Sequence, residues 1–360
     1  SSKFSTLKLR FSLGQTGNQE ILPYQSLGRL SFYSANFNNQ LAGGFAPSSY
    51  ANPNLGWETT TQYDLGIDLG LYRDRILLHS DIYYKVTNDL LLNIPLPFTS
   101  GLESAFQNFG SIENKGIEFS IQTLNTLGKF KWSTNLVMAF NRNTVLSLGP
   151  GITEFIPINP ANTNRPSEIV RVGTPLGNFY MYKADGVFQE GDDFSLSPSQ
   201  NVRAGSRKYK DIDGDGKVTA AGDVDIVGNA QPDFIGGITN NFKFKDFDLT
   251  IFFQGSYGNQ IFSNTKALLE IGSGFTGASA TLLNRWTPTN TDTDIPRAIE
   301  DPSPTLSDRF VEDGSYLRLK NLTLGYTLPQ VWLIRSKLQY ARVFYRITGP
   351  GQTIPGLIRK

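Results

Sequence analysis

The sequence has no cysteine, one histidine and two methionines among its 360 residues. Without cysteine the chain forms no disulfide and offers no thiolate to a metal. The single histidine, His79, leaves almost no scope for a histidine-based triad or a zinc site. Charged residues make up 18%, against about 25% in soluble domains, and the net charge is +1. We therefore predict no nucleic-acid partner.

The sequence also lacks long hydrophobic runs and enzyme motifs. No segment approaches the run of about 18 apolar residues that a transmembrane helix needs. There is no G-x-S-x-G motif and no phosphate-binding glycine loop, and no carboxylate pair stands out from its surroundings. We predict that the protein is not an enzyme. The opening segment, SSKFSTLKLRFSLG, resembles a strand and not a signal peptide, so we expect a fragment of a longer protein.

What the sequence does have is a repeated alternation of apolar and polar residues. In QYDLGIDLGL (62–71), every second residue from Tyr63 is apolar, while Asp64 and Asp68 lie on the opposite face. The other segments of this kind, the last two less regular, are 7–14, 75–89, 115–122, 130–141, 247–256, 315–329 and 341–347. A helical pattern occurs only at 264–271 and 279–286. The alternation predicts an all-β fold.

The lengths of the strands and of their connections favour a membrane barrel. The strands are roughly twice as long as the ~5–6 residues usual in soluble sheets. Tight turns are expected at 127–129 and 245–246, and long connections at about 143–235 and 257–314. Long extracellular loops opposite short periplasmic turns are typical of an antiparallel transmembrane β-barrel, here a partial one. A soluble β-sandwich or propeller is the alternative that alternation alone leaves open.

In a barrel, one face of each strand meets lipid and the other a polar lumen. We expect His79 to be a lumen or wall residue that forms a hydrogen bond. Aromatic residues near strand ends are expected to form the interfacial girdles. They are Tyr72, Tyr83, Tyr84, Phe130, Trp132, Phe247 and Tyr326.

The segment YKDIDGDGKVTAAGD (209–223) has the rhythm of a calcium-binding loop. Aspartates hold ligand positions 1, 3 and 5, as Asp211, Asp213 and Asp215. Position 12, where calcium loops carry a bidentate glutamate, is Gly222. Flanking helices are missing, so the sequence predicts a structural Ca²⁺ site and not a sensor.

Two further groups complete the predicted calcium site. The Lys217 carbonyl would occupy position 7, and Asp223 would close the site if one residue bulges out, with Asp225 as the second choice. The alternative is an Asp-Gly turn whose carboxylates accept hydrogen bonds from backbone N–H groups.

Aromatic residues in the long connections are candidates for contact with a sugar or a partner protein, or for small cores within the loops. They are Phe155, Phe179, Tyr180, Tyr182, Phe188 and Tyr257. The sequence does not identify substrate-binding residues.

Several stretches together resemble the barrel of SusC/RagA-like TonB-dependent outer-membrane transporters. They include NPNLGWETTTQYDLGIDLGL, NFGSIENKGIEFSI, VGTPLGNFYMYKADGVFQ, the block from YKDIDGDGKVTAAGDVDIVGNAQPDFIGG to GSYGNQIF, and SYLRLKNLTLGYTLPQ. The resemblance covers most of residues 1–343. It departs from the family in the tail 344–360, which a truncation or a frameshift would explain. The plug, TonB box and N-terminal regulatory-like domain of the family have no counterpart in this chain.

The resemblance implies outer-membrane import of glycan oligosaccharides or peptides in Bacteroidetes-type bacteria. It implies a SusD-like surface lipoprotein, a TonB complex reached through the absent N-terminal region, and outer-membrane lipid as partners. A TonB-dependent siderophore or cobalamin receptor is one alternative. A secreted, calcium-stabilised β-protein such as an adhesin is the other.

Overall fold

The computed structural model describes residues 3–21, 23–96, 98–102, 104–157, 167–198, 201–270, 277–298, 306–334 and 338–347. The chain divides into two compact units. The sheet unit comprises Ser1–Gly151, Pro232–Asn259 and Gly314–Lys360. The loop unit comprises Ile152–Gln231 and Gln260–Asp313. Among the described residues, no helix is long and apolar enough to cross a membrane.

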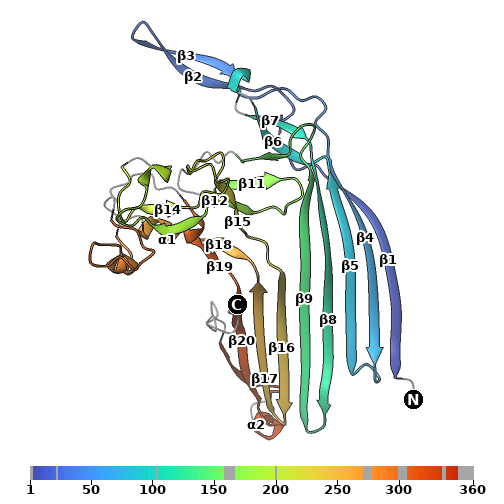
Figure 1. Cartoon of the computed structure of the whole chain (residues 1–360). Helices are drawn as coiled ribbons and strands as arrows, with labels where there is room; N and C mark the ends of the chain where they lie inside the picture. The colour runs from blue at the N-terminus through green and yellow to red at the C-terminus, as the bar shows by residue number, and fades with distance from the viewer. Residues whose placement is uncertain are drawn as a thin grey trace. The chain divides into compact units, whose positions relative to one another are not determined.

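The sheet unit is built on nine antiparallel strands in the order β1-β4-β5-β8-β9-β16-β17-β20-β21 (Figure 1). Their bounds are β1 (Phe4–Asn18), β4 (Glu58–Leu71), β5 (Ile76–Asn88), β8 (Ser111–Leu127), β9 (Phe130–Ser147), β16 (Phe234–Phe244), β17 (Phe247–Tyr257), β20 (Tyr316–Thr327) and β21 (Arg342–Ile347). The predicted all-β fold is confirmed.

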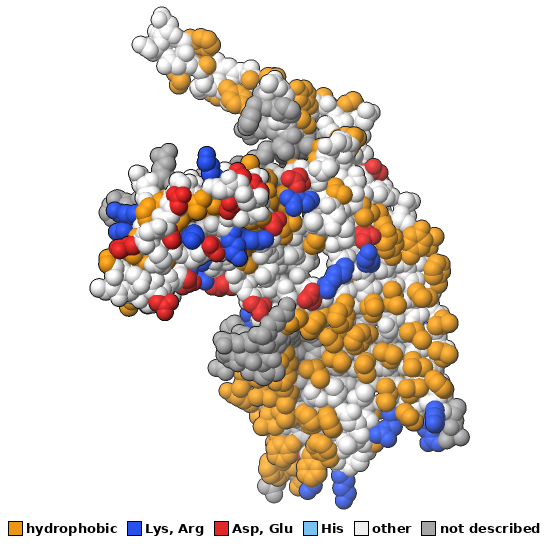
Figure 2. Space-filling model, viewed as in Figure 1, with side chains coloured by type: hydrophobic (Ala, Val, Ile, Leu, Met, Phe, Trp, Pro, Cys, Tyr) orange, Lys and Arg blue, Asp and Glu red, His pale blue; other side chains and the backbone are white. Residues whose placement is uncertain are grey.

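The strand register places apolar side chains in rows across one face of this sheet. One such row consists of Leu7, Leu69, Leu78, Ile121, Leu136, Ile238 and Phe253. One residue along, Asp68 lies opposite His79 on the other face. Figure 2 shows hydrophobic side chains spread over the strands on the apolar face. This face is the one that meets lipid in a transmembrane barrel.

Short turns join three pairs of strands at one end, where the β20-β21 connection (328–341) also lies, and the other long connections lie at the opposite end. Residues 72–75, 128–129 and 245–246 are the short turns between β4 and β5, β8 and β9, and β16 and β17. Tyr72, Arg73 and Asp74 adopt positive φ angles of 52°, 59° and 60° there. All the smaller sheets lie in the long connections. This asymmetry is the one predicted for periplasmic turns and extracellular loops.

Aromatic rings gather close to the short turns. Trp132 stacks on Phe242 with ring centroids 5.8 Å apart, and Phe247 lies 4.6 Å from Tyr326. Tyr83 does not belong to this girdle, because it lies on the polar face and donates a hydrogen bond to Asn141 at 2.9 Å.

Two hairpins and two short helices complete the sheet unit. Their bounds are β2 (Leu30–Phe37), β3 (Gln40–Pro47), β6 (Leu91–Pro95), β7 (Ser104–Asn108), η1 (Phe98–Ser100) and α2 (Gln330–Ile334). At the C-terminal end, β21 continues past position 343 to Ile347 and pairs with β20. The rest of the tail, residues 348–360, lies outside the described residues.

The loop unit has short strands in a four-stranded sheet, β10-β11-β12-β15, and in the pairs β13-β14 and β18-β19. The strands are β10 (Glu154–Phe155), β11 (Ser167–Arg171), β12 (Asn178–Tyr182), β13 (Ala184–Val187), β14 (Arg207–Tyr209), β15 (Val224–Asn229), β18 (Gln260–Phe262) and β19 (Val311–Asp313). The helices are η2 (Phe194–Leu196), α1 (Asn264–Glu270), η3 (Ala280–Asn284) and η4 (Asp308–Phe310). Ile169, Phe188 and Phe310 are buried at its core.

The two faces of β8 give a direct test of the orientation in the membrane. Replacing Ile121, on the apolar face, by arginine should lower the free energy of unfolding by about 2–4 kcal/mol, because the cation is placed in lipid. The measurement is denaturant unfolding of the full-length protein in phospholipid vesicles.

The matched control is Gln122→Arg, one residue along and on the opposite, polar face. It should change the unfolding free energy little, because the new cation faces water. Equal losses for the two variants would contradict the assignment of the faces.

Candidate functional site

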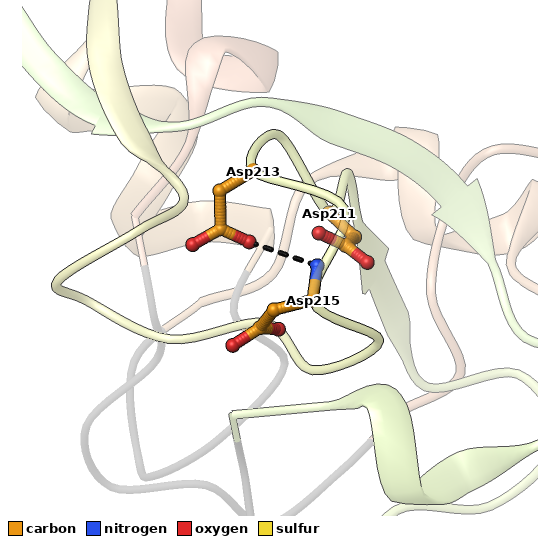
Figure 3. A group of neighbouring side chains, drawn as sticks. All are labelled: Asp211, Asp213 and Asp215. Atoms are coloured by element: carbon orange, nitrogen blue, oxygen red, sulfur yellow. Dashed lines mark hydrogen bonds between the residues drawn. The ribbon is translucent and has the colours of Figure 1, made fainter.

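The aspartate-rich segment forms a loop between β14 and β15 in the loop unit. One carboxylate oxygen from each of Asp211, Asp213 and Asp215 lies within 4.8 Å of the others, and all three residues are exposed. Figure 3 shows the three side chains on successive bends of the loop. The structure therefore brings together three of the five predicted calcium ligands.

Backbone N–H groups hold the loop's carboxylates in place. Asp211 accepts hydrogen bonds from Gly214 at 2.7 Å and from Gly216 at 2.9 Å. Asp213 accepts one from the Asp215 N–H at 3.1 Å, the bond drawn in Figure 3. Gly214 and Gly216 have φ angles of 75° and 83°, a conformation that favours glycine. These contacts are those of the Asp-Gly turn named as the alternative.

Asp223 occupies a different place from the one predicted. Its side chain is fully buried, and its carboxylate accepts hydrogen bonds from the Thr219 N–H at 2.7 Å and the Ile212 N–H at 2.5 Å. The Thr219 N–H is the main cause that lowers the pKa of Asp223, and the Ile212 and Asp213 N–H groups add to it against the opposing effect of burial. The Asp223 carboxylate thus joins the two ends of the loop by accepting hydrogen bonds from their backbone N–H groups.

The other residues of the predicted site form contacts within the loop unit, and the bond of the Lys217 N–H leaves the Lys217 carbonyl available. The Lys217 N–H donates to Asp215 at 2.8 Å. Asp225 lies on β15 and pairs with Lys183 at 2.9 Å, and this bond lowers the pKa of Asp225. Gly222, at the position of the missing glutamate, lies against Asp213. A Cβ atom at Gly222 would collide with the Asp213 carboxylate.

The donor set of the loop fits a hard divalent cation. Carboxylate oxygens are the ligands that Ca²⁺ prefers, and three of them converge here. Each of the three residues is exposed, so bound water could complete the coordination of a cation. The turn bonds fix the carboxylates without using all their lone pairs.

Several aromatic residues of the loops pack inside the loop unit. Phe179 and Phe188 are 7% and 1% exposed. The ring of Tyr182 contacts that of Tyr209 in a tilted arrangement, with centroids 5.1 Å apart, and burial raises the pKa of Tyr182. In the sheet unit, Tyr257 stacks on Phe234 at 5.3 Å. These residues contribute to cores and ring stacks.

The polar face of the sheet carries a charge cluster that sequence reasoning missed. Arg10 on β1 pairs with Asp68 at 3.0 Å and with Asp81 at 2.8 Å, and His79 bonds Asp68 at 2.9 Å. Gly66 lies beneath this cluster, where a side chain would meet the Arg10 guanidinium. Alternation put the acids on one face, but only the register brings Arg10 to them.

Comparison with known proteins identifies the family. Residues 4–345 match the family model described as TonB dependent receptor-like, beta-barrel. The chain belongs to this family. The TonB-dependent receptor barrel is an outer-membrane fold, in agreement with the apolar face of the sheet.

Named relatives and solved structures agree with this assignment. TonB-dependent receptor P3 of Formosa agariphila is 40% identical over 96% of this chain and 34% of its own length. TonB-dependent receptor SusC of Bacteroides thetaiotaomicron is 27% identical over 96% of this chain and 34% of its own. The structure of the RagAB peptide transporter matches 97% of this chain and 38% of that chain, with a TM-score of 0.78 and 27% identity. The chain thus spans about a third of the length of the curated relatives.

The buried carboxylate of Asp223 predicts how the loop responds to mutation and pH. Asp223→Asn should speed amide hydrogen exchange across 211–219 by about tenfold or more, because the amide cannot accept both N–H bonds. The control Asp185→Asn alters an exposed side chain of the same unit and should leave the exchange unchanged. Equal exchange in the two variants would contradict the role given to Asp223.

The sign of the pH effect follows from the lowered pKa. The stabilisation is fully present above 3.8, the ordinary value for the carboxyl. It should be lost as the pH falls below that value and through the lower pKa of the folded state. The protection factor of the wild-type loop, which compares its exchange with the intrinsic rate at the same pH, should therefore fall in acid, whereas the Asp223→Asn loop should not show this step.

Proposed function

We propose that the protein containing this chain imports oligosaccharides or peptides through the outer membrane as a SusC/RagA-like, TonB-dependent transporter. The observation that carries this proposal is the match of 97% of the chain to the RagAB peptide transporter. The likeness to SusC along 96% of the chain supports the same class. A SusD-like surface lipoprotein is the proposed partner, and a TonB complex is the proposed source of energy.

The sheet unit suits the wall of a hydrated pathway. Behind the apolar face lies a polar face with Arg10, Asp68 and Asp81 in one cluster. An ion pair between Arg342 of β21 and Asp248 of β17 lies on the same face, across β20. Gln62, Asp64, Tyr83, Asn114 and Asn141 are among the residues that line a polar pocket of about 340 Å³ on this face. Such side chains offer donors and acceptors to hydroxyl and amide groups without presenting a reactive centre.

Import is tested by deleting the gene in the native host and measuring growth on single oligosaccharides and peptides. Growth on at least one of them should be lost and should return with the full-length gene. A variant of the full-length gene in which only the TonB-contacting segment is deleted should give a protein that reaches the outer membrane but does not restore growth. A surface lipoprotein should co-purify with the full-length protein in detergent.

Two outcomes would count against import of oligosaccharides or peptides. In one, the deletion strain grows normally on every oligosaccharide and peptide. In the other, the deletion affects growth only when iron comes from a siderophore or when cobalamin is limiting, and this would assign the protein to another class of TonB-dependent receptor.

We further propose that Asp211, Asp213 and Asp215 hold a structural Ca²⁺, with the Lys217 carbonyl as an additional ligand. The convergence of three carboxylates within 4.8 Å supports this proposal. Three like charges at this distance repel one another, and a divalent cation would offset two of the three. The burial and N–H bonds of Asp223 give it a positioning role beside the ion, in place of the ligand role expected from the sequence.

Calcium binding is tested by thermal unfolding of the full-length protein after EDTA treatment and after addition of Ca²⁺. At a hundredfold excess over the dissociation constant, Ca²⁺ should stabilise the loop unit by about 2.7 kcal/mol. Asp213→Asn should remove most of this gain, whereas Asp185→Asn should keep it. A wild-type protein with the same unfolding profile in EDTA and in Ca²⁺ would refute the site.

A further inference from the structure

A second charged site in the loop unit has the opposite sign. A cavity of about 270 Å³ lies among β13, β14, α1 and η4. Four cationic side chains line it, from Arg207, Lys208, Lys266 and Arg309. Among the described residues, Asp294 contributes the one carboxylate of the lining.

Two of the four cations are neutralised by acids of the loop unit. Arg309 bonds the buried Glu270 at 3.2 Å and Asp294 at 2.8 Å. Lys266 pairs with Glu312 at 3.3 Å and donates to the Arg309 carbonyl at 3.1 Å. This network fixes one wall of the cavity and supplies little free positive charge.

The other two cations rest on buried aromatic rings. The Arg207 guanidinium lies 5.8 Å from the ring centre of Phe310, which is completely buried. Lys208 lies 5.7 Å from the ring of Phe188, which is 1% exposed, and its pairing with Asp192 is long, at 3.6 Å. Among the four cationic side chains, only that of Arg207 forms no hydrogen bond or ion pair with the part of the chain that the structure describes.

A guanidinium held by a ring keeps its N–H groups available. A cation–π contact uses the face of the guanidinium, whereas its five N–H donors lie in the plane. Those donors match the paired oxygens of a carboxylate, sulfate or phosphate group. Ser307, which is 1% exposed, adds a polar residue to the same lining.

We propose that this cavity binds an anionic oxygen group of the ligand, with Arg207 as its principal contact and Lys208 as the second cation. The proposal rests on the proposed import function, because it assigns the charged group of a small imported molecule to the loop unit. It names a ligand class, an acid or a sulfate ester, which the family assignment leaves open.

The test measures binding to the detergent-solubilised full-length protein by isothermal titration. The probes are glucuronate, N-acetylglycine and glucose 6-sulfate, with neutral glucose as the reference, all at one ionic strength. At least one anionic probe should bind more tightly than glucose. The probe that binds distinguishes a sugar acid, a peptide-type carboxylate and a sulfate ester as the source of the charge.

Three variants locate the binding in the cavity. Arg207→Gln should lower the affinity for the anionic probe by about tenfold or more. Arg207→Lys keeps a cation over Phe310 and should restore part of the affinity. Lys210→Gln removes an exposed cation of the same segment, outside the lining, and should leave the affinity unchanged.

Several outcomes would overturn the proposal. They are equal binding of glucose and the anions, equal weakening by Arg207→Gln and Lys210→Gln, or binding at wild-type affinity by an Arg207→Gln variant whose thermal unfolding is unchanged. Because these titrations need no energised membrane, anion binding without import would contradict only the proposed import function.

Discussion

The antiparallel hydrogen bonding of the nine-stranded sheet is the constraint on which the other features depend. In lipid, backbone N–H and C=O groups have no water to bond, so each strand must be paired along its length. The register that achieves this pairing also fixes the faces, because a slip of one residue would exchange them. Leu69 opposite Leu78 and Asp68 opposite His79 are two consequences of one alignment. The position of the apolar face and that of the polar charge cluster therefore cannot change independently of each other.

This constraint leaves the connections as the part of the chain that is free to carry specific chemistry. The loop unit has a core of its own, with Phe188 and Phe310 almost fully buried. The same two rings orient Lys208 and Arg207. Packing of the loop unit therefore also positions the two cations of its cavity, because a cation on a buried ring is held by the fold and not by a carboxylate.

The sequence predicts those parts of the structure that depend on local periodicity. Alternation over 62–71 and 130–141 indicates β4 and β9. No regular alternation indicates β16, because Gly236, Gly237 and Asn240 interrupt the pattern. The strands of the loop unit have two to six residues and are too short for any period to be recognised. The ion pair between Arg10 and Asp68 depends on the register of β1 against β4. These strands are neighbours in the sheet but far apart in the sequence, so no local pattern predicts their register. The three clustered aspartates were predicted because their spacing is local, but the burial of Asp223 was not, because burial is set by tertiary packing.

The displaced role of Asp223 changes what a cation can contribute at this loop. In a calcium loop that closes through its last ligand, the ion draws the two ends together. Here Asp223 already joins the ends through the N–H groups of Ile212 and Thr219, and Gly222 leaves space for the Asp213 carboxylate. An ion would therefore relieve repulsion among three exposed carboxylates in a loop that is already organised. Its effect should be confined to local stability, because no flanking helix is present among the described residues of this loop to transmit its binding.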